Sequence, residues 1–334
     1  MHRTRISRTH FQGKKILLTG GYGFIGSNLA IRLAKLGARV IILDSMLPDY
    51  GGNVFNLESV KKKVTVNFGD IRDEHLMNYI VRDIDYVFHL AGQVCHVKSL
   101  SDPFPDIDIN IKGTAILMEA LKKYNRNAKV IYTGTRGQYG SKTKLPVSEK
   151  DLPEPRGIYE ISNLAAEHII KIYNDIHGIK SVMLRLTNVY GPRAQMKHSR
   201  FGVVNWFIRQ AIEGKEIKVF GDGSILRDFL YVDDCVEAIL KSSVCHGAEG
   251  QILNVGVNKP TSFMELVKLI IDIAGSGSWD YYPFSPERAA QEPGNFYSDI
   301  RKIRRLTGWR PKTDLAKGIA ATVDFYKKNK EHYW

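Results

Sequence analysis

The segment KILLTGGYGFIGSNLAIRLAKLG, residues 15–37, decides the fold of this chain. It begins with a short apolar run that is typical of a buried β-strand, and it ends with the apolar spacing of an amphipathic helix. Between the two lie glycines 20, 21, 23 and 26, which satisfy both the G-x-G-x-x-G and the related G-x-x-G-x-x-G spacing. A strand, a glycine-rich turn and a helix in this order predict a nucleotide-binding βαβ unit.

The same alternation of strand and helix continues to about residue 191. Further apolar, β-branched runs predict strands at residues 38–44, 64–70, 86–92, 129–135 and 181–191. Their near-continuous apolarity suits strands that are buried on both faces of a sheet. The helical spacing between them implies right-handed crossover connections. We therefore predict an α/β fold with a Rossmann-type doubly wound parallel sheet.

After residue 191 the pattern loosens, and GPR, GDGS, NKPTS and FSPER separate shorter elements. These elements predict a smaller C-terminal α/β lobe that closes over the strand ends. Its predicted strands are residues 216–221 and 251–256, and its predicted helices are residues 201–214, 262–275, 299–308 and 314–329. We thus expect three parts: a basic, frayed tail (1–13), a mainly dinucleotide-binding domain (14–190) and a mainly substrate-binding lobe (191–334).

The formal net charge is +13, from 48 lysines and arginines against 35 aspartates and glutamates. This balance favours anionic partners such as nucleotides and diphosphates, although runs such as KKK at 61–63 also suit a solvated surface. Cys95, Cys235 and Cys245 form no CxxC pair, so we predict no disulfide framework and no metal site, and a reducing cytoplasm fits. No apolar run approaches the roughly 18 residues that span a bilayer, so no membrane partner is expected.

An acidic residue at the end of the second predicted strand indicates the cofactor. Asp44 comes 18 residues after Gly26, and the next residue is Ser45. A carboxylate at this place can accept hydrogen bonds from both hydroxyls of an adenosine ribose, and it would repel a 2′-phosphate. We therefore predict NAD, and not NADP, as the cofactor.

The segment TGTRGQYG, residues 133–140, ends the fifth predicted strand, where open α/β sheets bind their ligands. Tyr159 and Asn163 follow on a predicted helix with i, i+4 spacing, so both project from one helical face. A tyrosine in this place can act as a general base when nearby positive charge lowers its pKa. The hydroxyl of Thr135 could bind the same substrate oxygen. Without such a context, a single tyrosine on a helix more often packs into a core.

Taken in chain order, these motifs resemble the extended short-chain dehydrogenase/reductase group, specifically the NAD-dependent nucleotide-sugar epimerase/dehydratase family, and are UDP-glucose 4-epimerase-like. The resemblance runs from about residue 14 to residue 325. It rests on TGGYGFIG, GDIRD, HLAGQ, INIKGT, TGTRGQYG, the Y-x-x-S-x-x-x-x-E pattern from Tyr159 to Glu167, RLTNVYGP, RDFLYVDD and GWRP. It implies a nucleotide-diphosphate sugar as substrate, NAD as cofactor and a homodimer formed through a four-helix bundle.

The resemblance also implies roles for residues at the matching positions. The cofactor would be bound by Gly20, Gly23, Phe24, Ile25, Gly26, Asp44, Asp70, Ile71, Leu90, Ala91, Gly92, Tyr159 and Asn163. Thr135 and Tyr159 would be the catalytic hydroxyl and base, and Asn163 would occupy the position of a catalytic lysine. The substrate would contact Arg136, Asn188, Arg227 and Arg288. Asn110 is expected to stabilise the core and not to touch the substrate.

Two positions depart from the pattern of that family. Its dehydratases have an Asp-Glu pair directly after the catalytic threonine, whereas this chain has Arg136 and Gly137, so 4,6-dehydration is not expected. Its lysine binds the nicotinamide ribose and lowers the tyrosine pKa by its charge. Asn163 can form the hydrogen bond but is uncharged, so catalysis is expected to be weaker or shifted to alkaline pH.

The predicted function is an NAD-dependent nucleotide-sugar epimerase that acts at C4 of a UDP- or dTDP-hexose, through transient hydride transfer and a keto-sugar. Three alternatives stay open: epimerisation at C2, net redox at C4, or a protein that only binds NAD and a nucleotide sugar because Asn163 replaces lysine. Nucleic-acid binding is not expected, since aromatic residues do not interleave with a basic stripe. The predicted dimer interface uses Ile116, Leu117, Leu121, Ile169, Ile170 and Ile172.

Overall fold

The computed structural model describes residues 6–334 except 49, 97, 287–288 and 290–291. Its main sheet has seven parallel strands in the order β11-β6-β5-β4-β1-β2-β3. Their bounds are β1 (Lys15–Thr19), β2 (Arg39–Asp44), β3 (Val64–Phe68), β4 (Tyr86–His89), β5 (Lys129–Thr135), β6 (Ser181–Leu186) and β11 (Gln251–Val255). The predicted doubly wound sheet is therefore confirmed. The strand order reverses between β1 and β4, and such a reversal is where α/β sheets bind ligands.

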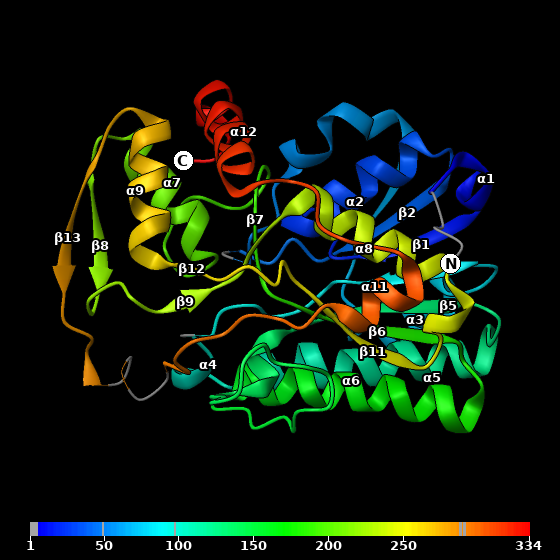
Figure 1. Ribbon diagram of the computed structural model, residues 1–334. Helices are drawn as coiled ribbons and strands as arrows, with labels where there is room; N and C mark the ends of the chain where they lie inside the picture. The colour runs from blue at the N-terminus through cyan, green and yellow to red at the C-terminus, as the bar shows by residue number, and fades with distance from the viewer. Residues whose placement is uncertain (1–5, 49, 97, 287–288, 290–291) are drawn as a thin grey trace.

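Helices cover both faces of this sheet (Figure 1). One face carries α2 (Phe24–Lys35), α8 (Val232–Val244) and α11 (Arg301–Thr307), and the other carries α3 (Glu74–Ile80), α5 (Gly113–Tyr124) and α6 (Ile158–His177). A separate cluster of buried apolar side chains fills the space under each set of helices. Every residue of β6 is buried, as the near-continuous apolarity of the strands predicted.

A buried histidine ties the centre of the sheet to the turn after β4. His89 ends β4, and its two ring nitrogens lie 2.9 Å from the hydroxyls of Thr19 and of Thr114. Burial lowers the pKa of His89 to about 4, so the ring is neutral near pH 7. The hydroxyl of Thr19 also accepts the backbone N–H of Ala91. This network holds the turn that begins at Leu90 against the end of β1.

The C-terminal lobe lies beyond the C-terminal ends of the main strands, at the left of Figure 1. It holds three two-stranded sheets: β7 (Asn188–Tyr190) with β10 (Phe229–Tyr231), β9 (Leu226–Arg227) with β12 (Thr261–Ser262), and β8 (Glu216–Phe220) with β13 (Ser278–Tyr282). Helices α7 (Val203–Ile212), α9 (Phe263–Ala274) and α12 (Leu315–Lys328) pack around a third apolar cluster. Short helices complete the fold: α1 (Arg8–Phe11), α4 (Lys98–Ser101), η1 (Val54–Lys63), the π-helix η2 (Asp106–Lys112), η3 (Arg136–Tyr139), η4 (His246–Ala248) and η5 (Lys330–His332).

Two features at the edges of the predicted domains differ from expectation. The tail is not frayed over its described residues, because Phe11 of α1 is fully buried and packs against Tyr86 with ring centroids 5.7 Å apart. The strand β11 was expected in the lobe, but it pairs in parallel with β6 and extends the main sheet. The predicted division at residue 190 therefore applies to most elements and not to all, because the chain returns to the sheet after that point.

The predicted dimer residues lie mostly inside the protomer. Ile116, Leu117, Leu121 and Ile170 are at most 9% exposed and belong to the chain's own core, so they cannot supply an interface. The reason is that the apolar stripes of α5 and α6 face the sheet. Other apolar side chains of α6 point outward, namely Ile161, Ile172 and Ile176, which are 47%, 50% and 71% exposed.

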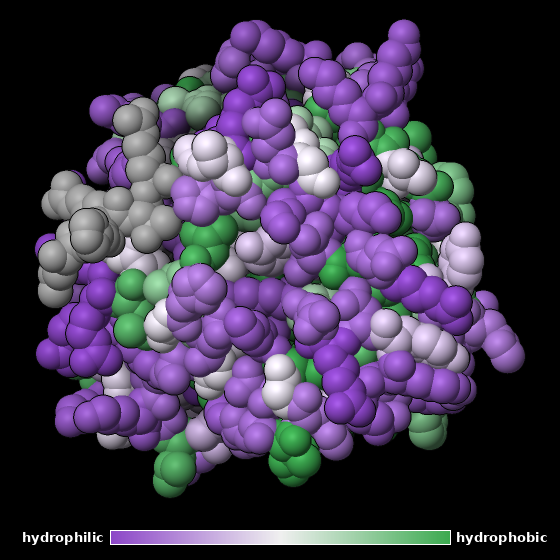
Figure 2. Space-filling view, turned by 90° about the vertical axis from the view of Figure 1, so that its right-hand side faces the viewer, coloured by the Kyte–Doolittle hydropathy of each residue, from purple (hydrophilic) through white to green (hydrophobic). Residues whose placement is uncertain are grey.

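The face seen in Figure 2, which is the right-hand side of Figure 1, is mostly hydrophilic, and its hydrophobic residues stand apart from one another. None of the helices in the described part of the chain is long and apolar enough to cross a bilayer. Because its hydrophobic residues are separated, the face in Figure 2 has no broad apolar surface.

Candidate active site

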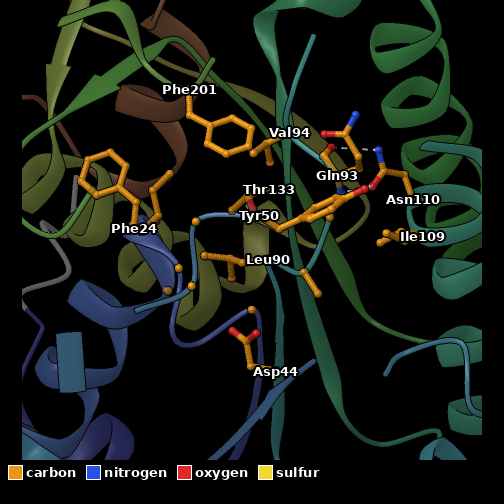
Figure 3. A pocket seen from close by; sticks show the side chains of 18 of the residues that line it. Phe24, Asp44, Tyr50, Leu90, Gln93, Val94, Ile109, Asn110, Thr133 and Phe201 are labelled. Atoms are coloured by element: carbon orange, nitrogen blue, oxygen red, sulfur yellow. Dashed lines mark hydrogen bonds between the residues drawn. The ribbon is translucent and has the colours of Figure 1, made fainter. Parts of the chain in front are cut away.

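A cavity of about 350 Å³ lies at the C-terminal ends of β1, β2, β4 and β5. Its lining comes from the glycine turn, from the ends of these strands, from α6 and from the first part of the lobe. Figure 3 shows Asp44 toward one end of it and Gln93 and Asn110 toward the other, with Phe24 and Phe201 on one side. The cavity thus joins the glycine turn to Thr135 and Tyr159, which both line it.

The glycine turn brings α2 into close contact with the end of β1. A Cβ atom on Gly26 would lie 2.1 Å from the carbonyl oxygen of Gly20, and a Cβ atom on Gly20 would lie 2.8 Å from the backbone nitrogen of Ala91. Gly20 also has a φ of +73°, which glycine adopts without steric cost. Two of the predicted glycines are therefore required by the backbone itself.

The start of α2 and the end of β2 present complementary groups to a dinucleotide. The N-cap of α2 is Gly23, which offers no side chain, so the first N–H groups and the positive end of the helix dipole suit a pyrophosphate. Asp44 accepts the backbone N–H groups of Tyr22 and Met46, each at 2.9 Å. Burial raises the pKa of Asp44, and these two hydrogen bonds oppose the rise. The carboxylate keeps lone pairs for ribose hydroxyls, and this donor and acceptor set fits NAD.

All the residues predicted to bind the cofactor line this cavity: Gly20, Gly23, Phe24, Ile25, Gly26, Asp44, Asp70, Ile71, Leu90, Ala91, Gly92, Tyr159 and Asn163. Asp70 is held by Arg72, whose Nη2 lies 2.7 Å from its Oδ2, and this hydrogen bond lowers the pKa of Asp70. Asp70 therefore stays ionised and fixed in place. The structure brings together in one cavity residues that the sequence spreads from position 20 to position 163.

Thr135 and Tyr159 line the same cavity as Asp44. Thr135 is the last residue of β5, and Tyr159 is in the first turn of α6. Burial raises the pKa of Tyr159 to about 12, although a hydrogen bond with the Thr135 side chain lowers it. The phenol is therefore protonated near neutral pH in this arrangement. Its use as a base depends on positive charge that comes close to it.

Two carboxylates raise the pKa of Tyr159 further, those of Glu160 and Asp106. Glu160 is buried, and its Oε1 lies 2.6 Å from Nδ1 of His96, whose ring packs edge-on to Tyr159 with centroids 6.4 Å apart. Asp106 begins the π-helix η2 and accepts a hydrogen bond of 2.7 Å from Gln93. Burial raises the pKa of Asp106 to about 6. The surroundings of the phenol are thus acidic, and this disfavours the phenolate.

Asn163 is held by two hydrogen bonds within the protein. Its Nδ2 donates to the backbone carbonyl of Tyr159 at 2.8 Å, and its Oδ1 accepts from the hydroxyl of Tyr132 at 3.1 Å. Both Asn163 and Tyr132 line the cavity. A polar, hydrogen-bonding group therefore occupies the position where a lysine was expected, but it brings no positive charge to the phenol.

Two of the predicted substrate residues, Arg136 and Arg227, lie outside the cavity lining. Arg136 follows Thr135 directly, and its guanidinium lies over the ring of Phe296 at 4.9 Å. Burial, and then the charge of Arg227, lower the pKa of Arg136 to about 10. Arg227 is itself buried and forms an ion pair with Glu292. In this arrangement Arg227 is already bound to a carboxylate, whereas Arg136 is not.

Neither Asn188 nor the two arginines line the cavity, although Thr187 and Val189 on either side of Asn188 do. Arg288 lies outside the described residues. The substrate contacts implied by the resemblance therefore stay predictions.

Asn110 has the structural role that was expected of it. Its Oδ1 accepts the backbone N–H of Gln93 at 2.8 Å, and its Nδ2 donates to the carbonyl of Gln93 and to Oγ of Ser162. It also lines the cavity, as Figure 3 shows. Asn110 therefore joins η2, the turn after β4 and helix α6, and so it holds the catalytic end together.

Several lining residues were not predicted from the sequence: Met46, Leu47, Tyr50, Gln93, Val94, Tyr132, Gln195, Phe201 and Asn205. Gln93 had a usable signal, because it follows HLAG at the end of a predicted strand. Phe201 and Asn205 had none, since they reach the cavity only by the folding of the lobe onto the sheet. The pair of His96 and Glu160 likewise joins segments with no common spacing.

The fold and this site match known proteins. A model described as the NAD dependent epimerase/dehydratase family matches residues 16–256. The UDP-glucose 4-epimerase of Mycolicibacterium smegmatis is 34% identical over 320 residues, which are 95% of this chain and 100% of that protein. The solved structure of UDP-glucose 4-epimerase from Thermotoga maritima with UDP-glucose matches this chain with a TM-score of 0.87 and 33% sequence identity. The match covers 95% of this chain and 99% of that chain. The Thermus thermophilus UDP-glucose 4-epimerase complex with NAD matches with a TM-score of 0.84 and 30% sequence identity. This match covers 94% of this chain and 99% of that chain.

Replacement of Gly26 by alanine tests the fit of the glycine turn. The added Cβ atom would lie 2.1 Å from the carbonyl oxygen of Gly20, so the start of α2 must move away from β1. Overpacking of this kind costs about 1–3 kcal/mol, and we expect NAD affinity to fall at least about tenfold. Titration with NAD followed by fluorescence measures this change.

The matched control is Gly247→Ala, because an added Cβ atom there meets no atom closer than 3.8 Å. We expect this variant to bind NAD as the unmodified protein does and to unfold at the same temperature. An unchanged NAD affinity in Gly26→Ala would contradict the assignment of the turn to the cofactor.

Proposed function

The chain belongs to the NAD-dependent epimerase/dehydratase family, and on this premise we propose that it is a nucleotide-sugar epimerase acting at C4 of a UDP- or dTDP-hexose. The observation that carries the proposal is that Thr135 and Tyr159 together line a cavity whose lining fits NAD, with the Thr135 side chain near enough to lower the pKa of the phenol. The relatives named as UDP-glucose 4-epimerases support C4 as the reacting carbon.

The residues of this chain would bind NAD, orient the sugar and transfer one proton. The glycine turn, the start of α2 and Asp44 would hold NAD, which when bound accepts a hydride from the sugar carbon and returns it. The hydroxyl of Thr135 would hydrogen-bond the oxygen on that carbon. Tyr159 would take the proton of this oxygen and later give it back, so the reaction has no net oxidation.

The site supports epimerisation better than dehydration. Removal of water needs an acid and a base directly beside the catalytic threonine, and this chain has Arg136 and Gly137 there. The two nearby carboxylates, Glu160 and Asp106, do not follow the threonine directly, and each is bound through one oxygen, to His96 and to Gln93. Epimerisation at C2 and net redox at C4 would use the same pair of Thr135 and Tyr159, and their products distinguish them.

A second candidate is a protein that binds NAD and a nucleotide sugar without converting the sugar. Two observations favour it: Asn163 adds no charge beside the phenol, and burial raises the pKa of Tyr159 to about 12. Under this alternative the cavity would be filled as in the enzyme, but no proton would be transferred.

Replacement of Tyr159 by phenylalanine decides between the two candidates. The change removes the proton acceptor and keeps the ring, so we expect the epimerisation rate to fall at least about 100-fold while NAD stays bound. The rate is followed by NMR with UDP-glucose, UDP-galactose and their N-acetyl forms from pH 6 to pH 10. The control is Tyr79→Phe on the exposed side of α3, which should keep full activity.

Absence of any product from the unmodified protein across this pH range, with NAD bound, would instead favour a binding protein. Equal rates in Tyr159→Phe and the unmodified protein would contradict the role of the phenol.

Replacement of Asn163 by lysine tests the missing charge. An ammonium one helical turn from Tyr159 favours the phenolate, and so the activity, which rises with pH as the phenol ionises, should reach half its maximum at a lower pH. We expect this midpoint to fall by about one unit or more. Asn163→Gln, which lengthens the side chain without a charge, should leave the midpoint where it is. An unchanged pH profile in Asn163→Lys would count against the electrostatic argument.

We also propose that the chain forms a homodimer through α6 and the neighbouring helices, and that it works in the cytoplasm. The outward row of Ile161, Ile172 and Ile176 on α6 supports the dimer, since these side chains recur on one helical face. The three unpaired cysteines support a reducing compartment.

Charges placed in this row should separate the protomers. We expect Ile172→Asp combined with Ile176→Asp to give the 37.8 kDa mass of one chain in light scattering, against twice that mass for the unmodified protein. Tyr281→Asp on β13, which is also exposed but lies in the lobe, should keep the larger mass. A single-chain mass for the unmodified protein would exclude the dimer.

A further inference from the structure

Arg136 carries a positive charge that no group of the described chain neutralises by contact. Its guanidinium donates no hydrogen bond and has no carboxylate within 4.0 Å among the described residues; its contact is the ring of Phe296. The side chain is partly buried, yet none of its nitrogen atoms belongs to the fully buried, unpaired atoms, so the nitrogens are open to solvent. A partly buried guanidinium usually pairs with a carboxylate, because water covers only part of its charge.

The charges around Arg136 act on it from a distance. Glu292, Asp228 and Glu160 each raise its pKa through space, whereas burial and Arg227 lower it. Each of these acids has a partner of its own: Glu292 pairs with Arg227, and Glu160 contacts His96. These carboxylates therefore stabilise the charge of the guanidinium from a distance, but they accept none of its N–H groups. Its planar set of N–H groups stays available to a ligand.

The position of Arg136 in the chain puts its guanidinium within reach of a sugar bound at Thr135 and Tyr159. Arg136 follows Thr135, the last residue of β5, which lines the cavity together with Tyr159. Any sugar that reacts at this pair lies against Thr135, within the length of one arginine side chain. Arg136 is also close enough to Tyr159 to lower the pKa of the phenol. A group on the sugar ring, next to the reacting carbon, is thus the part of the substrate that this guanidinium can reach.

We propose that Arg136 binds a carboxylate on the sugar, and that the preferred substrate is a nucleoside-diphosphate hexuronic acid and not the neutral hexose. This inference rests on the proposed function and names the substrate class of the same site. A guanidinium and a carboxylate match as two parallel N–H···O bonds, which a sugar hydroxyl cannot form. The diphosphate is assigned to Arg227, which would reach it by exchanging its ion pair with Glu292.

The test compares two ligands that differ only at C6 of the sugar, UDP-glucuronic acid and UDP-glucose, by calorimetric titration of the NAD-loaded protein. Charge-assisted hydrogen bonds are stronger than neutral ones, so we expect the acid to bind at least about tenfold more tightly. In Arg136→Gln the two affinities should become equal, while the affinity for UDP alone stays unchanged. Arg136→Lys keeps the charge without the fork and should retain part of the preference.

Two further variants separate specific from general effects. Arg227→Gln should weaken UDP, UDP-glucose and UDP-glucuronic acid by the same factor, because it acts on the diphosphate. Arg126→Gln removes an exposed arginine and should change nothing. Thermal unfolding of each variant shows that it is folded. The pair of glucuronic acid 1-phosphate and glucose 1-phosphate repeats the comparison without a nucleoside, so the result does not depend on the base.

Equal affinities for the acid and the neutral sugar in the unmodified protein would overturn this inference and leave the epimerase proposal in place. Equal weakening of UDP and of both nucleotide sugars in Arg136→Gln would also overturn it, because it would place Arg136 on the diphosphate. Failure of every nucleotide sugar and sugar phosphate to bind would overturn the proposed function as well.

Discussion

The close approach of α2 to the end of β1 is the constraint on which the site depends. Only because Gly26 and Gly20 lack side chains can the first turn of α2 lie against the carbonyl of Gly20. The same approach directs the free N–H groups of α2 into the cavity, beside Asp44. The network of Thr19, His89 and Thr114 then holds the next turn against the same edge. The cofactor end is thus shaped largely by backbone, which leaves little freedom for its ligand.

The catalytic end follows a different physical logic, in which burial and charge oppose each other. Burial, Glu160 and Asp106 disfavour the ionised form of Tyr159, whereas the hydroxyl of Thr135 and the charge of Arg136 favour it. In this chain Asn163 occupies the position of the expected lysine, and its side chain is bound by Tyr132 and by the backbone carbonyl of Tyr159. The electrostatic task of that lysine has no replacement on α6. Under the proposed function, proton transfer by this phenol would depend on charge that the ligands and Arg136 bring to the site.

Prediction from the sequence succeeded where one local pattern determines the outcome. The strands of the main sheet and the helices α2, α3, α5 and α6 lie where apolar periodicity indicated, because burial on one or both faces imposes that periodicity. It failed where a helix could bury its apolar stripe in more than one way. Leu117 and Ile170 pack under the sheet and not against a second protomer, and Phe11 turns an apparent basic tail into part of the core.

The sequence by itself determined the class of fold, the glycine turn, the acidic residue for the ribose and the helix that carries Tyr159, since each depends on residues close together in the chain. Only the tertiary structure decided which charges surround the phenol, that Arg227 is paired with Glu292, and that Arg136 has no carboxylate partner among the described residues. These contacts join segments that lie far apart in the chain. Their energies depend on distance and burial in the folded protein, and the order of residues contains neither quantity directly.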